Sequence, residues 1–380
     1  MDFTFTDEQR LLRDSLDRFL GNEYNFEARL RAIRTESGWR PEIWRALAED
    51  VGVLGAALPE DYGGFGGGPV DTMVVMQALG AALVVEPYLE TVVIAAGLLK
   101  RIDSPAASDA VSRIIAGTLI ATLAWGEPTS RFDAADVSTV ARRDGTGWRL
   151  DGRKSVVEAA PWADTLLVTA RTAGAQRERD GVSLFLVSAS QAGVAMRAYP
   201  TVDGRRNAEV AFDSVSLGAD ALLGPEGQAL PLVELVLDEA RAALCAEALG
   251  VLGQLQSQTI AYAKQRKQFG RAISDFQVLQ HRMVDMFMHL EQSVSMTYMA
   301  TLKLGLAADD RARAVSAAKS YVGRACTLVG QAAVQTHGGI GLTDELALSH
   351  YFKRATMIES ALGSSDYHLR RYQQSGHQHA

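Results

Sequence analysis

The chain has 380 residues, with 38 Lys and Arg against 45 Asp and Glu, and a formal net charge of −7. This acidic balance disfavours a nucleic-acid binder, and two cysteines, Cys245 and Cys326, are too few for a disulfide framework or a cysteine metal site. The polar beginning is not a signal peptide, and no apolar stretch is long enough for membrane insertion. Because the length exceeds what one core supports, we expect a cytoplasmic protein of two or three domains.

Residues 1–118 are predicted to form an N-terminal helical domain. Thr6 followed by Gln9 is the pattern of a capping box, and apolar residues then recur at helical spacing. Pro41 predicts the start of a second helix. The glycine-rich run 62–69 cannot be regular structure, so it is either a plain connection or part of a ligand site.

Residues 119–225 change to short runs rich in β-branched residues, separated by turn residues. We therefore expect a middle β domain, built as a barrel or a sandwich. The predicted strands are Trp148–Gly152, which should end in a turn, and residues 165–170, 182–187 and 208–212.

Residues 226–380 return to an apolar spacing of three and four residues. Helices are predicted at 232–255, 277–304, 311–335 and 343–362. Because short connections join long helices, this region predicts an antiparallel four-helix bundle. The fold class is therefore α+β, with helical domains on both sides of a β insert.

The first of two polar clusters in the bundle lies between two predicted helices. Arg266 precedes Gln268-Phe269-Gly270, and Gln277 follows at the start of the next helix. Cations near the C-terminus of a helix stabilise its dipole, which would explain the cluster without a ligand. The alternative is that Arg266 binds a phosphate while Phe269 packs against an aromatic ring.

The second cluster is the run Gln335-Thr336-His337-Gly338-Gly339-Ile340-Gly341. A left-handed helix end explains one glycine, but three glycines in four residues would also let another group approach the backbone closely. His337 is better interpreted as a packing or hydrogen-bonding residue than as a base.

The motifs RKQFG…FQ and QTHGGIG, after this order of domains, resemble the flavin-dependent acyl-CoA dehydrogenase family over essentially the whole chain. The shorter runs EDYGGFG, GEP, LDGRKSVV and LDEAR fit the same resemblance in order and spacing. The resemblance implies an FAD enzyme that oxidises an acyl-CoA thioester to the 2-enoyl-CoA. A carboxylate would remove the α-proton, the β-hydride would pass to the flavin, and an electron-transfer flavoprotein would accept the electrons.

The resemblance also implies that FAD lies between two subunits, so that its contacts divide into two sets. The set that reaches across to the neighbour's cofactor is intact in this sequence, with Arg266 on the pyrophosphate. Its residues are Arg266, Gln268, Phe269, Gln277, Gln335, Thr336, Gly338 and Gly339.

The set that would hold the flavin ring within the subunit is altered. Gly126 stands where the family has a threonine hydroxyl, and Arg131 and Phe132 replace small residues. In the second loop Val157 has no hydroxyl, and Glu158 brings a negative charge near an anionic cofactor. These loops depart from the family pattern for binding the flavin.

The catalytic base is missing from both of its usual positions, which Gly363 and Ala240 occupy. Asp238 and Arg241 of the LDxxR motif remain, and the resemblance implies that they support substrate binding. Glu247 follows Ala240 on the same helix face, about 10 Å along the axis. It is the leading replacement base, or else a buried carboxylate paired with an arginine, which we favour.

Three functional hypotheses follow. The first is the small, base-less subunit of an α₂β₂ acyl-CoA dehydrogenase, as in pimeloyl-CoA or steroid side-chain acyl-CoA dehydrogenases, which completes the FAD site of a larger subunit. The second is a self-sufficient homotetramer with Glu247 as its base. The third is a flavin-free protein that keeps the fold for assembly or for binding a CoA ligand.

Overall fold

The computed structural model describes residues 5–375. Packing divides it into two compact units: the chain through Leu30 with Pro69–Val84 and everything from Arg241 onward, and Arg31–Gly68 with Val85–Ala240. The division falls inside one long helix, α7 (Leu230–Gln265). The two units are defined by packing contacts, so each contains segments that are separate in the chain. The domain limits near residues 118 and 225 stay predictions.

The N-terminal helices begin where the sequence predicts. At the start of α1 (Asp7–Glu23), the backbone N–H of Gln9 donates to Thr6 Oγ1 at 3.2 Å, and Gln9 Oε1 accepts from the backbone N–H of Thr6 at 3.1 Å. Pro41 is the first residue of its helix. The remaining α- and π-helices before the sheet are α2 (Phe26–Ile33), α3 (Pro41–Glu49), α4 (Pro69–Ala81), a π-helix (Leu89–Ala95), α5 (Ala96–Leu99) and α6 (Pro105–Ile115).

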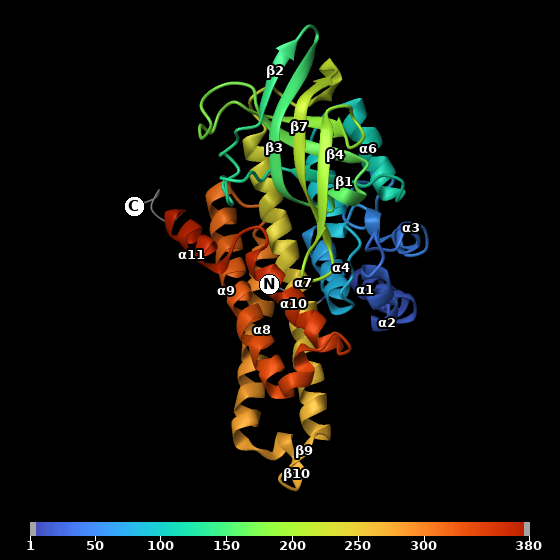
Figure 1. Ribbon diagram of the computed structural model, residues 1–380, viewed down its shortest axis with the longest axis vertical. Helices are drawn as coiled ribbons and strands as arrows, with labels where there is room; N and C mark the ends of the chain where they lie inside the picture. The colour runs from blue at the N-terminus through green and yellow to red at the C-terminus, as the bar shows by residue number, and fades with distance from the viewer. Residues whose placement is uncertain (1–4, 376–380) are drawn as a thin grey trace. The chain divides into compact units, whose positions relative to one another are not determined.

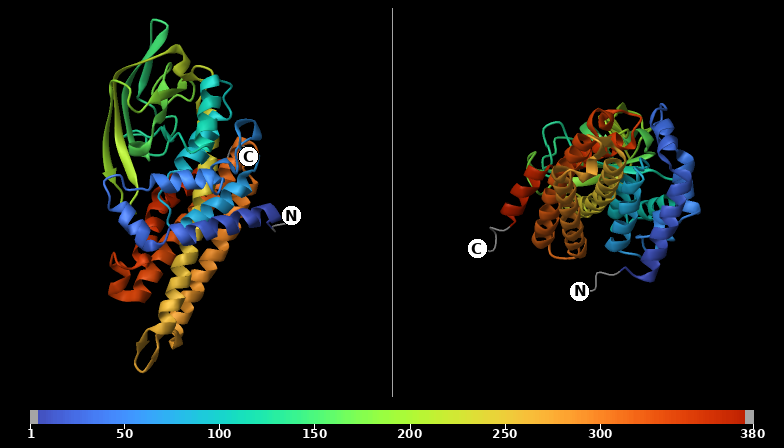
Figure 2. Two further views of the ribbon diagram at one scale, coloured as in Figure 1. Left: turned by 90° about the vertical axis from the view of Figure 1, so that its right-hand side faces the viewer. Right: turned by 90° about the horizontal axis from the view of Figure 1, so that it is seen from below.

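The middle of the chain forms one curved sheet (Figures 1 and 2). Its strands are β1 (Ala121–Ala124), β2 (Val140–Asp144), β3 (Gly147–Glu158), β4 (Thr165–Arg171), β5 (Val182–Ser188), β6 (Val194–Pro200), β7 (Arg206–Leu217) and β8 (Leu222–Leu223). The order is β6-β7-β3-β2-β4-β5-β8, with β1 parallel to β4. The β domain is confirmed; over the described residues the order has two ends, so the sheet is open and is not a closed barrel. Trp148 packs edge-on against Phe185 in its apolar core.

Gly152 does not end a strand, so the turn predicted there is wrong. β3 continues through Gly152, with a register shift against β7 between Leu150 and Gly152. The turn of the β2–β3 hairpin contains Gly145 instead. Gly152 has φ 151°, and a Cβ there would lie 2.6 Å from Thr139 Cα, so this glycine permits a bulge and a close approach.

The C-terminal part is the predicted helical bundle, which is confirmed (Figure 1). After α7 come a short hairpin of β9 (Lys267–Gln268) and β10 (Arg271–Ala272), then α8 (Gln277–Leu302), α9 (Ala308–His337), α10 (Ala347–Ser360) and α11 (Ser365–Gln374). α9 packs against α8, α10 and α11. Cys245 and Cys326 are buried in these helices, where burial raises the pKa of each thiol to about 12.

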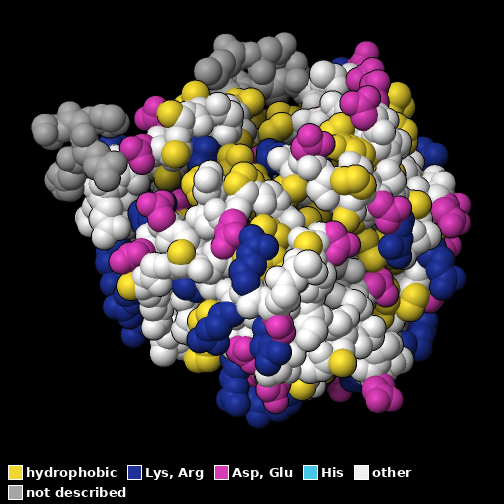
Figure 3. Space-filling model, turned by 90° about the horizontal axis from the view of Figure 1, so that it is seen from above, with side chains coloured by type: hydrophobic (Ala, Val, Ile, Leu, Met, Phe, Trp, Pro, Cys, Tyr) yellow, Lys and Arg dark blue, Asp and Glu magenta, His cyan; other side chains and the backbone are white. Residues whose placement is uncertain are grey.

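Two surface properties agree with the composition. Among residues 5–375, no helix is long and apolar enough to cross a membrane. On the face drawn in Figure 3, cationic and anionic side chains are interspersed, and no continuous basic surface of the kind that binds nucleic acid is seen there.

Candidate functional site: two half-sites and an absent base

The hairpin after α7 presents a concentration of positive charge to solvent. Lys264, Arg266, Lys267 and Arg271 are all exposed, and no carboxylate among the described residues forms an ion pair with any of them. The Arg271 guanidinium stacks on the Phe276 ring, 4.1 Å from the ring centroid. The charged groups of Lys264, Arg266 and Lys267 are available to an anion. Diphosphates are recognised by such groups, and by the planar guanidinium of arginine in particular.

Phe269 lies at the tip of this hairpin and is 91% exposed. Its φ of 53° is unfavourable for a residue with a bulky side chain. Within the chain its ring has one aromatic neighbour, Phe276, at a centroid distance of 6.1 Å. A strained, exposed aromatic residue indicates a contact with another molecule, because the fold itself gains little from it.

The turn after α9 contains two consecutive glycines, Gly338 and Gly339, which differ in backbone conformation. Gly338 has φ 67° and ψ −148°, which favours glycine on backbone grounds alone. Gly339 has no positive φ, and a Cβ at either position would meet nothing within 4 Å. The fold therefore explains Gly338 but not Gly339, whose missing side chain leaves room for an external group.

The other residues predicted for this half-site differ in exposure. Gln268, Gln277 and Gln335 are exposed, whereas Thr336 is buried and its hydroxyl donates to the Ala332 carbonyl at 2.7 Å. The hydroxyl of Thr336 is thus directed to its own helix. Its contact with FAD stays a prediction, as do those of the three glutamines.

His337 has the packing role that the sequence indicates. Its ring stacks on Tyr262 at a centroid distance of 4.3 Å and an interplanar angle of 24°. Nδ1 lies 2.8 Å from the Ala333 carbonyl, so it carries the proton in the neutral ring. Burial lowers the pKa of His337, outweighing that hydrogen bond, and the ring is uncharged at neutral pH.

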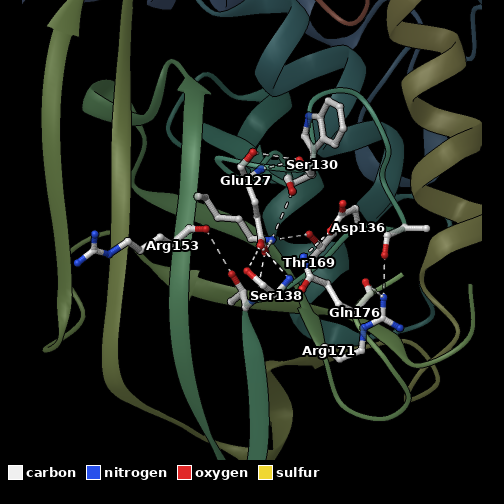
Figure 4. A network of polar contacts seen from close by, with 12 residues as sticks. Glu127, Ser130, Asp136, Ser138, Arg153, Thr169, Arg171 and Gln176 are labelled. Atoms are coloured by element: carbon white, nitrogen blue, oxygen red, sulfur yellow. Dashed lines mark hydrogen bonds and ion pairs between the residues drawn. The ribbon is translucent and has the colours of Figure 1, made fainter. Parts of the chain in front are cut away.

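The GEP and LDGRKSVV runs meet at a buried ion pair, shown in Figure 4. Lys154 Nζ donates to Glu127 Oε1 at 2.7 Å and to Thr169 Oγ1 at 3.0 Å. Glu127 also accepts from the hydroxyl and the backbone N–H of Ser138 and from the backbone N–H of Thr139. These bonds fix the loop after β1 against β3.

Burial and the mutual attraction of the two charges act in opposite directions on the pKa of each member of this pair. Burial raises the pKa of Glu127, but the Lys154 charge and the hydrogen bonds outweigh it and hold the pKa at about 2. Burial lowers the pKa of Lys154 to about 8, although the Glu127 charge opposes this change. The sequence analysis did not predict this pair, because its two residues lie in separate motifs 27 positions apart.

The two stretches predicted as flavin-binding loops have irregular backbone here: the first is the loop after β1, whereas residues 155–158 form the end of β3, at a register shift against β7. Arg131, Val156 and Ala159 all have positive φ, of 51°, 53° and 58°. For a β-branched residue such as Val156 this is a rare and strained conformation. The backbone N–H of Ser155 donates to the Gly126 carbonyl at 2.8 Å, so the two segments are bonded to each other.

Carboxylates lie beside the second of these segments. Ser155 Oγ donates to Glu209 Oε2 at 2.7 Å, which places this carboxylate against the second segment. Burial, and then the negative charges of Glu209 and Glu158, raise the pKa of Tyr199 beside them. Val157 is 2% exposed and belongs to the apolar core. Gly126 and Val157 have no hydroxyl, so this half-site does not offer the flavin ring the hydrogen bonds of the family pattern.

Neither usual base position can supply a base. Ala240 is fully buried. Gly363 has φ 116°, and a Cβ there would lie 2.5 Å from His368 Nε2 and 2.6 Å from Tyr367 Cδ1. The turn is therefore packed around glycine.

Buried donors hold the carbonyl groups of this turn. Lys319 Nζ donates to the carbonyls of Ile358, Glu359 and Gly363 at 2.9, 3.0 and 2.8 Å. Arg241 Nε donates to the Leu362 carbonyl at 3.1 Å. Sequence reasoning missed Lys319; the available signal was a lone lysine within the apolar spacing of a predicted helix.

The sequence allowed Glu247 to be either a replacement base or a buried carboxylate paired with an arginine. In the structure it forms such a pair. Arg354 Nε donates to Glu247 Oε1 and Arg354 Nη2 to Oε2, each at 2.7 Å, and both side chains are buried. Asp238 is also fully buried, and Arg241 is 3% exposed. The predicted roles of Glu247 in catalysis and of Asp238 and Arg241 in substrate binding stay predictions.

Comparison with known proteins agrees with the order of elements. Residues 6–102, 122–215 and 230–376 match the acyl-CoA dehydrogenase N-terminal, middle and C-terminal domains. The chain belongs to the acyl-CoA dehydrogenase family, flavin-dependent oxidoreductases that act on CH–CH bonds, and the resemblance read from its motifs is confirmed.

Several relatives cover nearly the whole chain. Acyl-CoA dehydrogenase FadE27 of Mycobacterium tuberculosis is 30% identical and covers 98% of this chain and 97% of its own. Among solved structures, the ChsE4–ChsE5 complex from Mycobacterium tuberculosis has a TM-score of 0.89 at 30% identity. The Tcur3481–Tcur3483 steroid ACAD has a TM-score of 0.88 at 28% identity; each structure covers 98% of both chains.

Proposed function

We propose that this chain is the base-less subunit of a heteromeric acyl-CoA dehydrogenase, and that it completes the FAD site of a larger, catalytic subunit. One observation carries the proposal: the half-site that reaches across to the neighbour keeps the family pattern, whereas the half-site for the flavin ring departs from it. The hairpin and the Gly338–Gly339 turn offer free cations, an exposed aromatic ring and an open backbone. The corresponding segments of the β domain have strained backbone, are hydrogen-bonded to each other and have Glu158 and Glu209 beside them.

In this proposal the hairpin and the glycine turn hold the pyrophosphate and adenosine of FAD in the partner's site. Arg266 binds the diphosphate, and Phe269 packs on a ring of the cofactor. Gln268, Gln277 and Gln335 supply polar contacts, and Gly339 admits the cofactor close to the backbone. When bound there, FAD would supply the acceptor for the hydride from the β-carbon of the substrate, and a carboxylate of the partner would take the α-proton.

A partner subunit is further supported by exposed apolar residues on α8. Val284, Phe287 and Met288 are 54%, 50% and 49% exposed, and their spacing places them on one face of the helix. Val278 on the same helix is 68% exposed, and Leu328 of α9 is 49% exposed. Apolar side chains gathered in this way are typical of a protein interface.

The substrate class follows from the relatives as a proposal. One structural neighbour is described as a steroid ACAD, and another is a complex of two named proteins. We propose an acyl-CoA thioester with a bulky tail of steroid type, and an electron-transfer flavoprotein as the electron acceptor. The absence of a carboxylate at positions 240 and 363 supports proton abstraction by the partner.

Flavin content tests the proposal. The chain is purified alone and after co-expression with a family member encoded beside it, and FAD is counted by absorbance per chain. We expect no bound flavin on the lone chain and one FAD per pair of different chains in the complex. A lone chain that binds one FAD and oxidises an acyl-CoA would establish the homotetramer instead. A stable complex that takes up no FAD would establish a flavin-free role.

A further inference from the structure

Tyr262 is the point at which the ends of α7 and α9 meet in the bundle. Besides the ring stack on His337, the Tyr262 hydroxyl lies 3.4 Å from the His337 carbonyl and donates to it. The ring of His337 is 6% exposed and held by its own helix through the Ala333 carbonyl. One tyrosine of α7 therefore contacts both the side chain and the backbone of the last residue of α9.

Each member of this stack is linked to one of the two proposed cofactor-binding elements, the hairpin after α7 and the glycine turn after α9. The backbone N–H of Arg266 donates to the Tyr262 carbonyl at 2.9 Å, the last helical bond before the hairpin. On the other side, His337 immediately precedes Gly338, and a Cβ on Gly341 would lie 3.0 Å from His337 Cβ. The glycine turn thus folds back onto the same histidine.

We propose that Tyr262 and His337 form a positioning pair that sets the separation between Arg266 and the Gly338–Gly339 turn, so that both bind one diphosphate of a flavin nucleotide. The inference rests on the proposed function. Neither side chain needs to touch the cofactor. Tyr262 is partly buried and directed at His337, whereas the groups that face solvent are Arg266 and the glycine turn.

The physical reason is that two contacts on one ligand reinforce each other only at a fixed distance. A displacement of about 1 Å between binding groups can remove most of that gain. The hairpin itself has two-residue strands, which give it little stiffness of its own. A stacked aromatic pair directly below both elements supplies the missing constraint.

The test uses the co-expressed complex and FAD as the titrated ligand, followed by flavin fluorescence. Tyr262→Leu removes the ring and should weaken FAD binding by ~10-fold, whereas Tyr262→Phe keeps the ring and should stay within ~2-fold of the parent. Tyr372→Leu removes an aromatic residue of α11 and is the matched control, which should bind FAD as the parent does. His337→Leu breaks the same stack from α9 and replaces Tyr262→Leu if that variant does not fold.

A double-mutant cycle separates positioning from general stability. In an Arg266→Gln background, Tyr262→Leu should change FAD affinity by less than ~2-fold, because it acts through Arg266. An undiminished effect in that background would overturn the positioning role, and so would normal FAD binding by both Tyr262→Leu and His337→Leu. A parent complex that binds no FAD would instead refute the proposed function. Faster amide hydrogen exchange at residues 338–342 in Tyr262→Leu without FAD would support the inference independently of flavin binding.

Discussion

Arg354 of α10 and Glu247 of α7 form a buried pair in which both carboxylate oxygens accept a guanidinium hydrogen bond at 2.7 Å. A general base must offer a lone pair to a substrate proton within hydrogen-bond reach. Each oxygen of Glu247 is already engaged by Arg354, and the side chain is 2% exposed. The pair therefore has the geometry of a structural ion pair.

Glu247→Gln in the co-expressed complex should leave turnover within ~3-fold of the parent while it lowers the free energy of unfolding by about 3 kcal/mol, because the Arg354 charge stays buried without its carboxylate. Steady-state kinetics and denaturant unfolding measure the two effects. The double variant Glu247→Leu with Arg354→Met removes both charges and should recover part of the stability. A folded Glu247→Gln complex that loses turnover by ~10³-fold would make Glu247 the base.

Restoring a carboxylate at the usual position should fail. Gly363→Glu forces a side chain onto a φ of 116° and into His368, so we expect no dehydrogenase activity from the lone chain and a loss of ~1–3 kcal/mol in stability. Ser360→Glu adds the same charge at an exposed helical residue and should be nearly neutral. Thermal unfolding and an acyl-CoA oxidation assay are compared for both variants. Activity gained by Gly363→Glu would show that the turn can open into a catalytic geometry.

The two glycines after α9 should respond differently to alanine. Gly338→Ala should reduce stability by ~1 kcal/mol or more, because its backbone conformation suits only glycine. Gly339→Ala should fold as the parent does, since a Cβ there meets nothing within 4 Å, yet it should weaken FAD binding by the complex ~10-fold through contact with the cofactor. Thermal unfolding and FAD titration separate the effects. Unchanged FAD affinity in Gly339→Ala would remove this residue from the cofactor site.

Repeated patterns let the sequence predict most of the fold. Capping residues, helical spacing and strand-like runs located α1, α3, α7 and the main strands, because each of these signals is local. α11 was missed because its residues 365–374 are largely polar and carry no apolar period. The turn predicted at Gly152 was wrong because glycine is favoured both in turns and in β-bulges, and the residue type alone does not distinguish the two.

The candidate site was predictable only where it consists of consecutive residues. Arg266 and the Gly338–Gly339 turn lie in short motifs, whereas the contacts of Lys319 and Tyr262 join residues that are far apart in the chain. The Glu247–Arg354 pair spans 107 positions, so the sequence left two readings of Glu247. Long-range pairing of this kind is set by tertiary packing and has no local signal.

Acid should weaken the β domain through Glu127. Its pKa in the fold, about 2, lies below the ordinary value of 4.5, so the unfolded chain binds more protons between these values. The stabilisation by Glu127 is therefore complete above pH 4.5 and is lost as the pH falls toward 2. In Glu127→Gln, denaturant unfolding at a series of pH values should show a shallower loss of stability in that range. An unchanged slope would mean that Glu127 is not the group that titrates.

Lys319→Met should loosen the turn that replaces the catalytic loop. The substitution keeps the apolar stem but leaves the carbonyls of residues 358, 359 and 363 without their donor, at a cost of ~3 kcal/mol or more. We expect faster amide hydrogen exchange at residues 358–365 and a lower unfolding temperature. Lys303→Met, at an exposed lysine just after α8, is the matched control and should change neither. Protection of residues 358–365 that survives in Lys319→Met would show that Arg241 and His368 hold the turn without the lysine.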